Sequence, residues 1–168
     1  HEANALPGLA NRFGRHLASR ALSNFQIPGW EVRDVIGLPI RDSIWKIGAL
    51  ASSDRKRAQE KARTNFGLAS DVKTILIFGG SLGAAKLNDA LELSLDRIME
   101  RGYQVLHSVG EGKSAPPRKF GYQPLPFISE MDQAYLAADL VISRSGAGTC
   151  AEILATGVPA ILIPLNIG

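Results

Sequence analysis

The sequence has little cysteine and no long apolar run, and both absences limit what the protein can be. Its 168 residues include one cysteine, Cys150, which excludes an intrachain disulfide and is typical of a reducing compartment. The longest apolar run, residues 158–165, is interrupted by Pro159 and Pro164 and falls short of the roughly 18 residues of a membrane span. The N-terminus lacks the pattern of a signal peptide. Since the chain starts without methionine and stops directly after a strand-like run, we expect it to be a piece of a longer protein.

An excess of charge of one sign is also lacking. The formal net charge is +3, from 19 Lys and Arg against 16 Asp and Glu, which is too small to indicate a nucleic-acid-binding protein. The hydrophobic fraction of 45% excludes disorder as the main state. Residues 1–71 hold 11 basic against 7 acidic side chains, whereas residues 72–168 hold 8 against 9. The basic first part is compatible with an anionic ligand, although a solvated helix face is the more common explanation.

Residues 72–168 alternate strand-like and helical segments. The strand-like segments lie at residues 74–78, 103–107, 140–142 and 160–163, with a short extended stretch at 125–128. The first of them is a continuous apolar run, typical of a strand buried on both faces. The helices between them are predicted after Gly83, over 131–137, and up to Thr156. The first of these has an apolar stripe formed by Leu87, Leu91, Leu95 and Ile98. This alternation predicts an α/β fold, a Rossmann-like parallel sheet with helices on both faces.

Residues 1–71 follow a different pattern. Their first apolar residues recur at helical spacing and predict a helix that Asn4 can cap. These residues are Leu6, Leu9, Phe13 and Leu17. Residues 32–36 predict a short strand, and residues 42–53 resemble a loop. Residues 54–66 predict a polar helix that Gly67 ends, and this composition suits a surface helix or a connector between domains.

Two glycine-rich turns, residues 79–83 and 145–148, each follow a predicted strand and open a predicted helix. In an open parallel sheet such turns lie at the carboxyl ends of the strands, which form the ligand-binding edge. Glycine lets the backbone approach a ligand closely, and free N–H groups at a helix start favour an anion such as phosphate. Any tight turn of this kind favours glycine, but two at one edge favour a nucleotide or phosphate site.

The residues around these turns argue against two common nucleotide sites. A dinucleotide fingerprint needs G-x-G-x-x-G and an acidic residue ending the second strand. This chain has G-G-S-L-G at residues 79–83 and His107 followed by Ser108 instead. The sequence Gly-Lys-Ser at residues 112–114 resembles the end of a P-loop, but the prolines at 116–117 prevent the helix that must follow. Neither NAD nor a P-loop site is predicted.

The first turn also matches the G-x-S-x-G pattern of a serine-hydrolase nucleophile, with Ser81 at its centre. A catalytic triad should continue with an acidic residue and then a histidine along the chain. His107, at the end of the next strand, is the only histidine after Ser81, and the acidic residues before it lie on the intervening helix. We therefore keep a serine hydrolase as a minor alternative, which labelling of Ser81 by a fluorophosphonate would support.

Several short motifs occur in an order that resembles one enzyme family. They are His1-Glu2-Ala3-Asn4, Gly37-Leu38-Pro39-Ile40-Arg41, Gly79-Gly80-Ser81-Leu82-Gly83-Ala84 with Leu87-Asn88, Phe127-Ile128, and Ser143-Arg144-Ser145-Gly146-Ala147 with Glu152. Over nearly the whole chain this series resembles the MurG family of peptidoglycan N-acetylglucosaminyltransferases. The resemblance implies an inverting enzyme of the two-domain GT-B fold that moves GlcNAc from UDP-GlcNAc to the muramoyl-pentapeptide of lipid I, forming lipid II. It implies no metal, no cofactor besides the donor substrate, and no nucleic acid.

The resemblance also assigns roles to individual residues. Arg41 would stabilise the departing diphosphate, Glu152 would hold the ribose hydroxyls, and Asn4 would face the donor sugar. The two glycine-rich turns would surround the diphosphate and the sugar, and an apolar slot would receive uracil. The turn residues are Gly80, Ser81, Gly83, Ala147, Gly148 and Thr149, and the slot residues are Phe127, Ile128 and Met131.

Three parts of the chain follow from the resemblance. Residues 1–41 would end the acceptor-binding N-terminal domain, residues 42–71 would connect the domains, and residues 72–168 would form a truncated UDP-sugar-binding domain. The family's general base, its GlcNAc-recognising segment and its membrane-docking patch would lie outside this sequence. We therefore expect the chain alone to be inactive, and the whole enzyme to be peripheral on the cytoplasmic face of the bacterial plasma membrane. A non-catalytic UDP-sugar-binding module that needs a partner chain remains the main alternative.

Overall fold

The computed structural model describes residues 1–3, 7–29, 34–80 and 83–164, and the chain divides into two compact units. The first unit spans residues 1–40 and the second spans residues 41–168. Each unit is described by itself. The assignment of residues 1–41 to an acceptor domain, 42–71 to a connector and 72–168 to a donor domain stays a prediction.

The first unit contains one helix and one pair of short strands. Helix α1 (Leu9–Gly14) begins after Gly8, so the predicted cap at Asn4 is wrong for this helix, and Asn4 itself lies outside the described residues. Strands β1 (Leu22–Ser23) and β2 (Asp34–Val35) pair in parallel. The buried Glu2 carboxylate accepts bonds from the Gly8 amide N (3.0 Å) and from Asn11 Nδ2 (3.0 Å). Three residues of the predicted apolar stripe are exposed on this unit: Leu9, Phe13 and Leu17.

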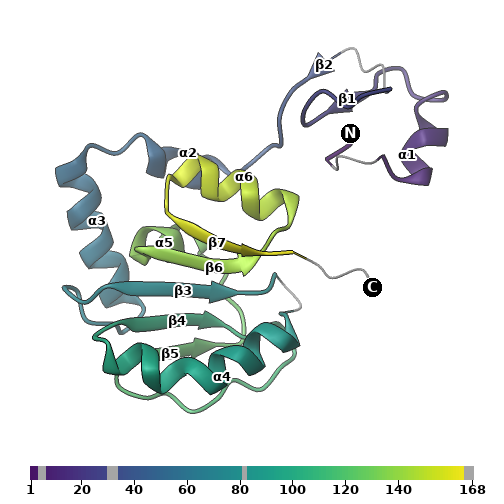
Figure 1. Ribbon diagram of the computed structural model, residues 1–168. Coiled ribbons are helices and arrows are strands. Elements are labelled where there is room, and N and C mark those ends of the chain that lie inside the picture. Colours follow the sequence, from purple (N-terminus) through teal and green to yellow (C-terminus); the bar gives the residue numbers. More distant parts are fainter. Residues whose placement is uncertain (4–6, 30–33, 81–82, 165–168) are drawn as a thin grey trace. The chain divides into compact units, whose positions relative to one another are not determined.

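The second unit is built on a five-stranded parallel sheet. Its strands are β3 (Thr74–Phe78), β4 (Gln104–Ser108), β5 (Tyr122–Leu125), β6 (Leu140–Arg144) and β7 (Ala160–Ile163). The spatial order is β5-β4-β3-β6-β7, so β3 lies at the centre (Figure 1). All five residues of β3 and of β4 are buried, as the continuous apolar run at 74–78 predicted. The predicted parallel sheet is confirmed.

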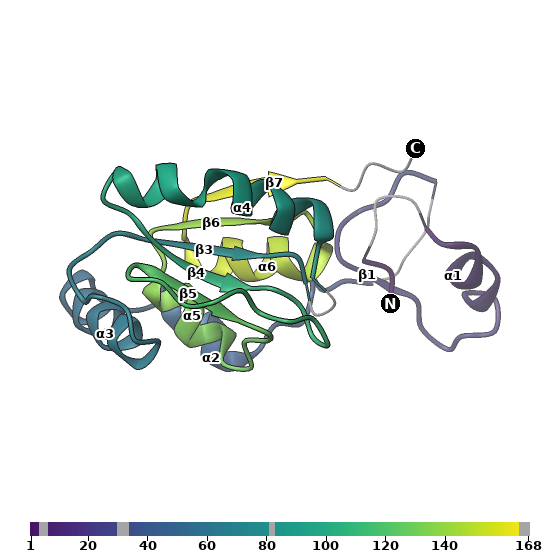
Figure 2. The ribbon, with the colours of Figure 1, turned by 90° about the horizontal axis from the view of Figure 1, so that it is seen from below.

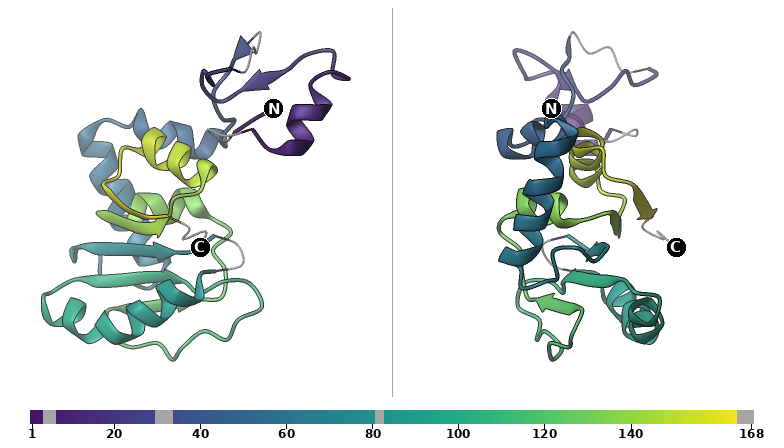
Figure 3. Two further views of the ribbon diagram at one scale, coloured as in Figure 1. Left: turned by 45° about the vertical axis from the view of Figure 1, so that its right-hand side comes forward. Right: turned by 90° about the vertical axis from the view of Figure 1, so that its left-hand side faces the viewer.

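Helices cover both faces of this sheet. Helix α4 (Ala85–Glu100) lies on one face, and α5 (Met131–Ala137) and α6 (Ala147–Thr156) lie on the other (Figure 2). The right-hand view of Figure 3 looks along the sheet and shows α4 on one side of it, with α3 (Ser52–Asn65) and α5 on the other. The apolar stripe of α4 packs on side chains of β3, β4 and β5. The packed residues are Leu87, Leu91 and Leu95 with Ile75, Ile77, Val105 and Tyr122. The predicted α/β fold class is therefore confirmed.

Two local expectations differ from the structure. Residues 42–53 are not a loop, because α2 (Asp42–Gly48) forms there and buries Ile44 and Ile47, one helical turn apart. Its last residue packs so closely on α6 that a Cβ on Gly48 would lie 2.2 Å from the carbonyl oxygen of Ala155. The extended stretch expected at 125–128 instead forms β5, three residues earlier. Strand β5 contains Pro124, which lacks an amide donor, and it is tolerated because β5 is an edge strand.

Helix α3 belongs to the packed body of the second unit because of one buried cation. Arg63 is 5% exposed and donates to the carbonyl oxygens of Ala137 (3.0 Å) and Ser70 (3.0 Å). Its third contact is an ion pair with Asp139, with 2.6 Å between Nη2 and Oδ2. The same Asp139 oxygen accepts the amide of Thr74 at 2.7 Å. Arg63 thus joins α3, the end of α5 and the starts of β3 and β6.

Replacing Arg63 with methionine tests this link. The variant Arg63→Met keeps the apolar stem but removes the ion pair with Asp139 and the donors to the carbonyl groups of Ala137 and Ser70. We expect the free energy of unfolding to fall by about 3 kcal/mol, toward the lower end for a broken buried pair because Asp139 is partly exposed. The matched control, Arg57→Met at an exposed position of the same helix, should change it by under about 0.5 kcal/mol. Urea denaturation measures both variants, and an equal fall in the free energy of unfolding of the two would contradict this account.

Candidate functional site

The sheet has a topological switch point between β3 and β6. From β3 the chain continues over one face to β4, while β6 pairs with the other edge of β3 and leads on to β7. Because the strands are parallel, the turns that follow β3 and β6 lie at one edge of the sheet. Ligands of open α/β sheets bind in the crevice at such a point. The two predicted glycine-rich turns thus begin beside each other at the expected edge.

The glycines of the first turn serve packing as well as access. A Cβ on Gly79 would lie 2.3 Å from the amide N of Ala84, and one on Gly83 would lie 2.1 Å from the carbonyl O of Val109. Gly80 has a φ of +93° and open space beside it. The Gly83 amide donates to the Gly80 carbonyl (2.9 Å), so this N–H is used within the turn. Ser81 lies outside the described residues.

A cavity of about 150 Å³ lies at this edge and brings together six of the predicted site residues. They are Arg41, Gly80, Phe127, Ile128, Met131 and Glu152. Three residues that the sequence did not single out complete its lining: Phe78, Ser108 and Ser129. The cavity therefore combines a guanidinium, a carboxylate, an exposed stretch of glycine backbone and an apolar wall.

The two charged side chains of the cavity are held by different elements. Arg41 is the N-cap residue of α2, and its Nη1 donates to the carbonyl of Ser129 at 3.5 Å. Glu152 lies on α6, and its Oε1 is 3.9 Å from Arg41 Nη2. The exposed fractions of the two side chains are 56% and 21%. Their separation is that of a loose ion pair, so both groups remain available to a ligand.

The apolar wall of the cavity has an exposed and a buried part. Phe127 is 48% exposed, whereas Ile128 is 3% exposed and belongs to the core. Met131 begins α5 and is partly buried. An exposed aromatic ring beside a glycine-rich turn offers a surface on which a planar base can pack. Of the three predicted slot residues, Phe127 thus presents the largest free apolar surface.

Three other predicted residues lie in the first turn of α6 and do not line the cavity. Ala147, Gly148 and Thr149 follow Gly146, the N-cap residue, which makes no side-chain capping bond. The first intrahelical bond from this end runs from the Cys150 amide to the Gly146 carbonyl. The three preceding N–H groups have no acceptor within the helix, and such groups favour an anion.

Sequence reasoning missed Tyr135, which contacts the Glu152 side chain of the site. Its hydroxyl donates to Glu152 Oε2 at 2.9 Å, and its side chain is fully buried. Burial and the neighbouring Glu152 carboxylate both raise the pKa of Tyr135. A signal was present, because Tyr135 stands on the predicted helix 131–137 and a buried phenol needs a partner. The identity of that partner, on another helix, was not contained in the local pattern.

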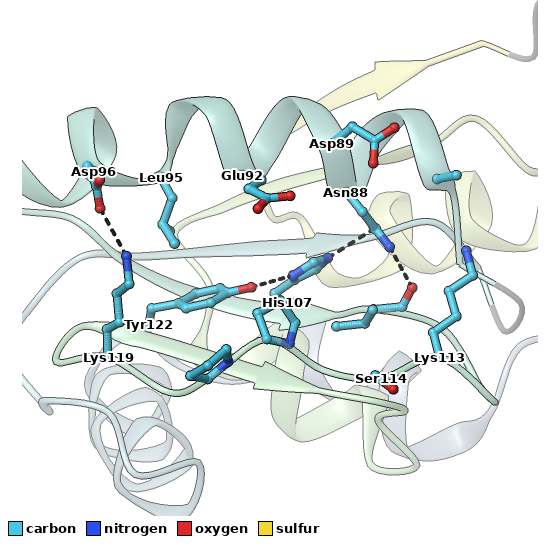
Figure 4. A pocket seen from close by; sticks show the side chains of 14 residues that line it. Asn88, Asp89, Glu92, Leu95, Asp96, His107, Lys113, Ser114, Lys119 and Tyr122 are labelled. Carbon is cyan, nitrogen blue, oxygen red and sulfur yellow. Dashed lines mark hydrogen bonds and ion pairs between the residues drawn. The ribbon is translucent and has the colours of Figure 1, made fainter.

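A second and larger pocket, of about 510 Å³, lies between α4 and the segment that joins β4 to β5 (Figure 4). A directed chain of hydrogen bonds crosses it. Asn88 Nδ2 donates to the Val109 carbonyl (3.0 Å), so its Oδ1 accepts from His107 Nε2 (3.1 Å). His107 Nδ1 then accepts from the Tyr122 hydroxyl (2.9 Å). Both ring nitrogens are occupied, so His107 is not placed as the base of a Ser81 triad.

Within residues 1–3, 7–29, 34–80 and 83–164, no three His, Cys, Asp or Glu side chains are grouped so that they could hold a metal ion. No helix in this described part of the chain is long and apolar enough to span a membrane.

Comparison with known proteins gives a consistent set of relatives. Residues 74–168 match the glycosyltransferase family 28 C-terminal domain. The chain is 44% identical over its whole length to a UDP-N-acetylglucosamine--N-acetylmuramyl-(pentapeptide) pyrophosphoryl-undecaprenol N-acetylglucosamine transferase from Corynebacterium glutamicum. It is 45% identical to the protein of the same name from Thermobifida fusca. It covers 45% and 44% of these two relatives, so it spans less than half their length.

A solved structure supports the same relationship. The chain resembles a crystal structure of MurG from Acinetobacter baumannii, with a TM-score of 0.69 and 29% sequence identity. The match covers 100% of this chain and 46% of the MurG chain. The predicted GT-B class and the resemblance to MurG are therefore confirmed.

The buried His107 makes stability depend on pH. Burial lowers its pKa from 6.5 to about 4, so the unfolded chain binds the proton first as the pH falls. We expect this group to lower the free energy of unfolding by about 2 kcal/mol between about pH 7.5 and pH 5. Histidine ring NMR checks the cause directly: His107 should remain neutral, with its proton on Nε2, at about pH 5.5. In the urea-unfolded chain, His107 should titrate near pH 6.5. Protonation of folded His107 above about pH 6 would contradict the account.

Proposed function

Since the chain belongs to glycosyltransferase family 28, we propose that it carries the donor-binding half of an inverting N-acetylglucosaminyltransferase. The whole enzyme would move GlcNAc from UDP-GlcNAc to lipid I and so form lipid II in peptidoglycan synthesis. The observation that carries the proposal is the cavity at the switch point, where Arg41, Glu152 and Phe127 meet the glycine-rich turn after β3. The activity that the relatives' names state supports the choice of sugar and acceptor.

Each part of UDP finds complementary chemistry at this edge. The diphosphate would lie against the Gly80 backbone and the free N–H groups that open α6. Ser81 would join it there, and Asn4 would face the sugar. The uracil would pack in the slot formed by Phe127, Ile128 and Met131. The ribose hydroxyls would donate to the Glu152 carboxylate, which is an acceptor when ionised.

The transfer step uses Arg41 at the leaving group. A base removes the proton from the acceptor hydroxyl, and the oxygen attacks the anomeric carbon. The bond between that carbon and the phosphate oxygen breaks, and its electron pair leaves with UDP. A guanidinium and helix-start N–H groups aimed at the diphosphate stabilise the charge that develops there. No residue described around the cavity stands as the general base, so we assign the base to a part of the enzyme outside this sequence.

The acceptor places the reaction at a membrane surface. Undecaprenol, the lipid in the name of the relatives, is a long apolar chain that remains in a bilayer. We therefore propose that the whole enzyme works as a peripheral protein on the cytoplasmic face of the plasma membrane. Contacts with lipid I and with the bilayer would come from the N-terminal part of the enzyme.

Ligand preference tests the nucleotide site. We expect the 168-residue chain to bind UDP at least about tenfold more tightly than ATP or NAD, because the cavity offers one apolar slot beside a diphosphate-binding edge. Isothermal titration calorimetry with the three nucleotides measures this directly. Equal affinity for all three would remove the argument for a UDP site.

The carboxylate of Glu152 supplies a second test, made in the whole enzyme. The change Glu152→Gln keeps the size but removes the charge that strengthens hydrogen bonds from the ribose, so the KM for UDP-GlcNAc should rise about tenfold or more. The melting temperature and the KM for lipid I should change little. Glu100→Gln is a matched control at an exposed position, at the far end of α4 from this edge. A Glu152→Gln variant that melts several degrees lower but binds UDP-GlcNAc normally would show that Glu152 only stabilises its helix.

A further inference from the structure

A buried phenol stands directly behind the proposed ribose site. Tyr135 lies on α5, and its ring packs edge-to-face against Phe78 with 6.1 Å between the ring centroids. Phe78 ends β3 and also lines the 150 Å³ cavity. The ring of Tyr135 is fully buried, so its position is set by the core and does not depend on a ligand.

The hydroxyl of Tyr135 takes up one oxygen of the Glu152 carboxylate. The bond to Oε2 is 2.9 Å long and has an ionised acceptor, which makes it stronger than a bond between neutral groups. Burial and the charge of Glu152 raise the pKa of the phenol, so Tyr135 keeps its proton and acts as a permanent donor. The other oxygen, Oε1, has Arg41 Nη2 at 3.9 Å, beyond hydrogen-bond distance.

This arrangement prevents the two charged groups of the cavity from neutralising each other. A carboxylate with both oxygens free tends to form a two-bond pair with a nearby guanidinium. With Oε2 held by Tyr135, Glu152 cannot turn both oxygens toward Arg41. Oε1 then remains an acceptor for a ligand, and the guanidinium of Arg41 remains a donor for one.

We propose that Tyr135 is a positioning residue that fixes Glu152 as an acceptor for the ribose hydroxyls and so sets the preference for ribonucleotides over deoxyribonucleotides. The proposal rests on the proposed function, in which Glu152 meets the ribose. A site whose polar group is built to pair with a substrate hydroxyl discriminates against an analogue without it, because that group is then left unpaired. The discrimination depends on how firmly the polar group is held, and Tyr135 supplies that restraint.

The test compares UDP with 2′,3′-dideoxy-UDP, which lacks both ribose hydroxyls, by calorimetry on the whole enzyme. The wild type should favour UDP by about tenfold or more. Tyr135→Phe keeps the ring and its packing on Phe78 but removes the donor, and it should reduce this ratio about fivefold or more by weakening UDP alone. In Glu152→Gln, the ratio of UDP affinity to dideoxy-UDP affinity should fall by as much as in Tyr135→Phe. The double variant that carries both changes should have the same ratio as Glu152→Gln alone.

The matched control is Tyr122→Phe. Tyr122 is a second buried phenol whose hydroxyl bonds to a side chain, that of His107, and it lies on the α4 side of the sheet. Loss of the Tyr122 hydroxyl should lower the melting temperature without changing the ratio of UDP to dideoxy-UDP affinity. This control separates loss of a buried hydroxyl in general from loss of the one that holds Glu152.

The outcomes distinguish this inference from the function on which it rests. If the wild type does not favour UDP over the dideoxy analogue, or if Glu152→Gln keeps the preference, the proposed role of Glu152 fails. If Glu152→Gln loses the preference while Tyr135→Phe retains it, only the role of Tyr135 is overturned. If Tyr135→Phe weakens both nucleotides equally, Tyr135 has a structural role alone and the inference is wrong.

Discussion

The burial of β3 on both faces and between two parallel neighbours is the constraint on which the second unit depends. Parallel neighbours require crossovers, and the order β5-β4-β3-β6-β7 sends them over opposite faces, with α4 on one side and α5 and α6 on the other. The turns that leave β3 and β6 therefore separate at one edge. The crevice between them is where the cavity lies, so the location of the site follows from the topology before any side chain is considered.

Two polar contacts fix α5 within this arrangement, one at its end and one at its centre. Arg63 donates to the carbonyl of Ala137, and Tyr135 donates to Glu152. The first contact joins α5 to α3 and the second joins it to α6. A seven-residue helix has little stability of its own, so its position depends on such neighbours and on the burial of Tyr135 and Ala137. These two contacts connect α3, through α5, to the Glu152 carboxylate in the cavity.

The sequence predicted the bounds of three elements of the second unit. The bounds 74–78, 131–137 and 160–163 agree with β3, α5 and β7. It did not predict α2, whose two buried isoleucines lie within a short polar segment. It also missed the start of β5, because a proline within a run argues against a strand unless the strand lies at a sheet edge. At the site, motif resemblance predicted Arg41, Phe127 and Glu152, which the structure brings together. Tyr135 was missed because its partner lies on another helix, and local periodicity does not encode such a pairing.

The cavity holds opposite charges 3.9 Å apart without a tight two-bond pair between them. A tight pair would satisfy both groups and leave little to offer a ligand. Here Arg41 donates to the carbonyl of Ser129, and the phenol of Tyr135 takes one oxygen of Glu152. The Glu152 carboxylate is thus held by a buried phenol, whereas Arg41 bonds to Ser129, which itself lines the cavity. A molecule with an anionic part for Arg41 and a hydroxyl part for Glu152 meets a carboxylate that is already oriented, so less ordering remains to oppose its binding.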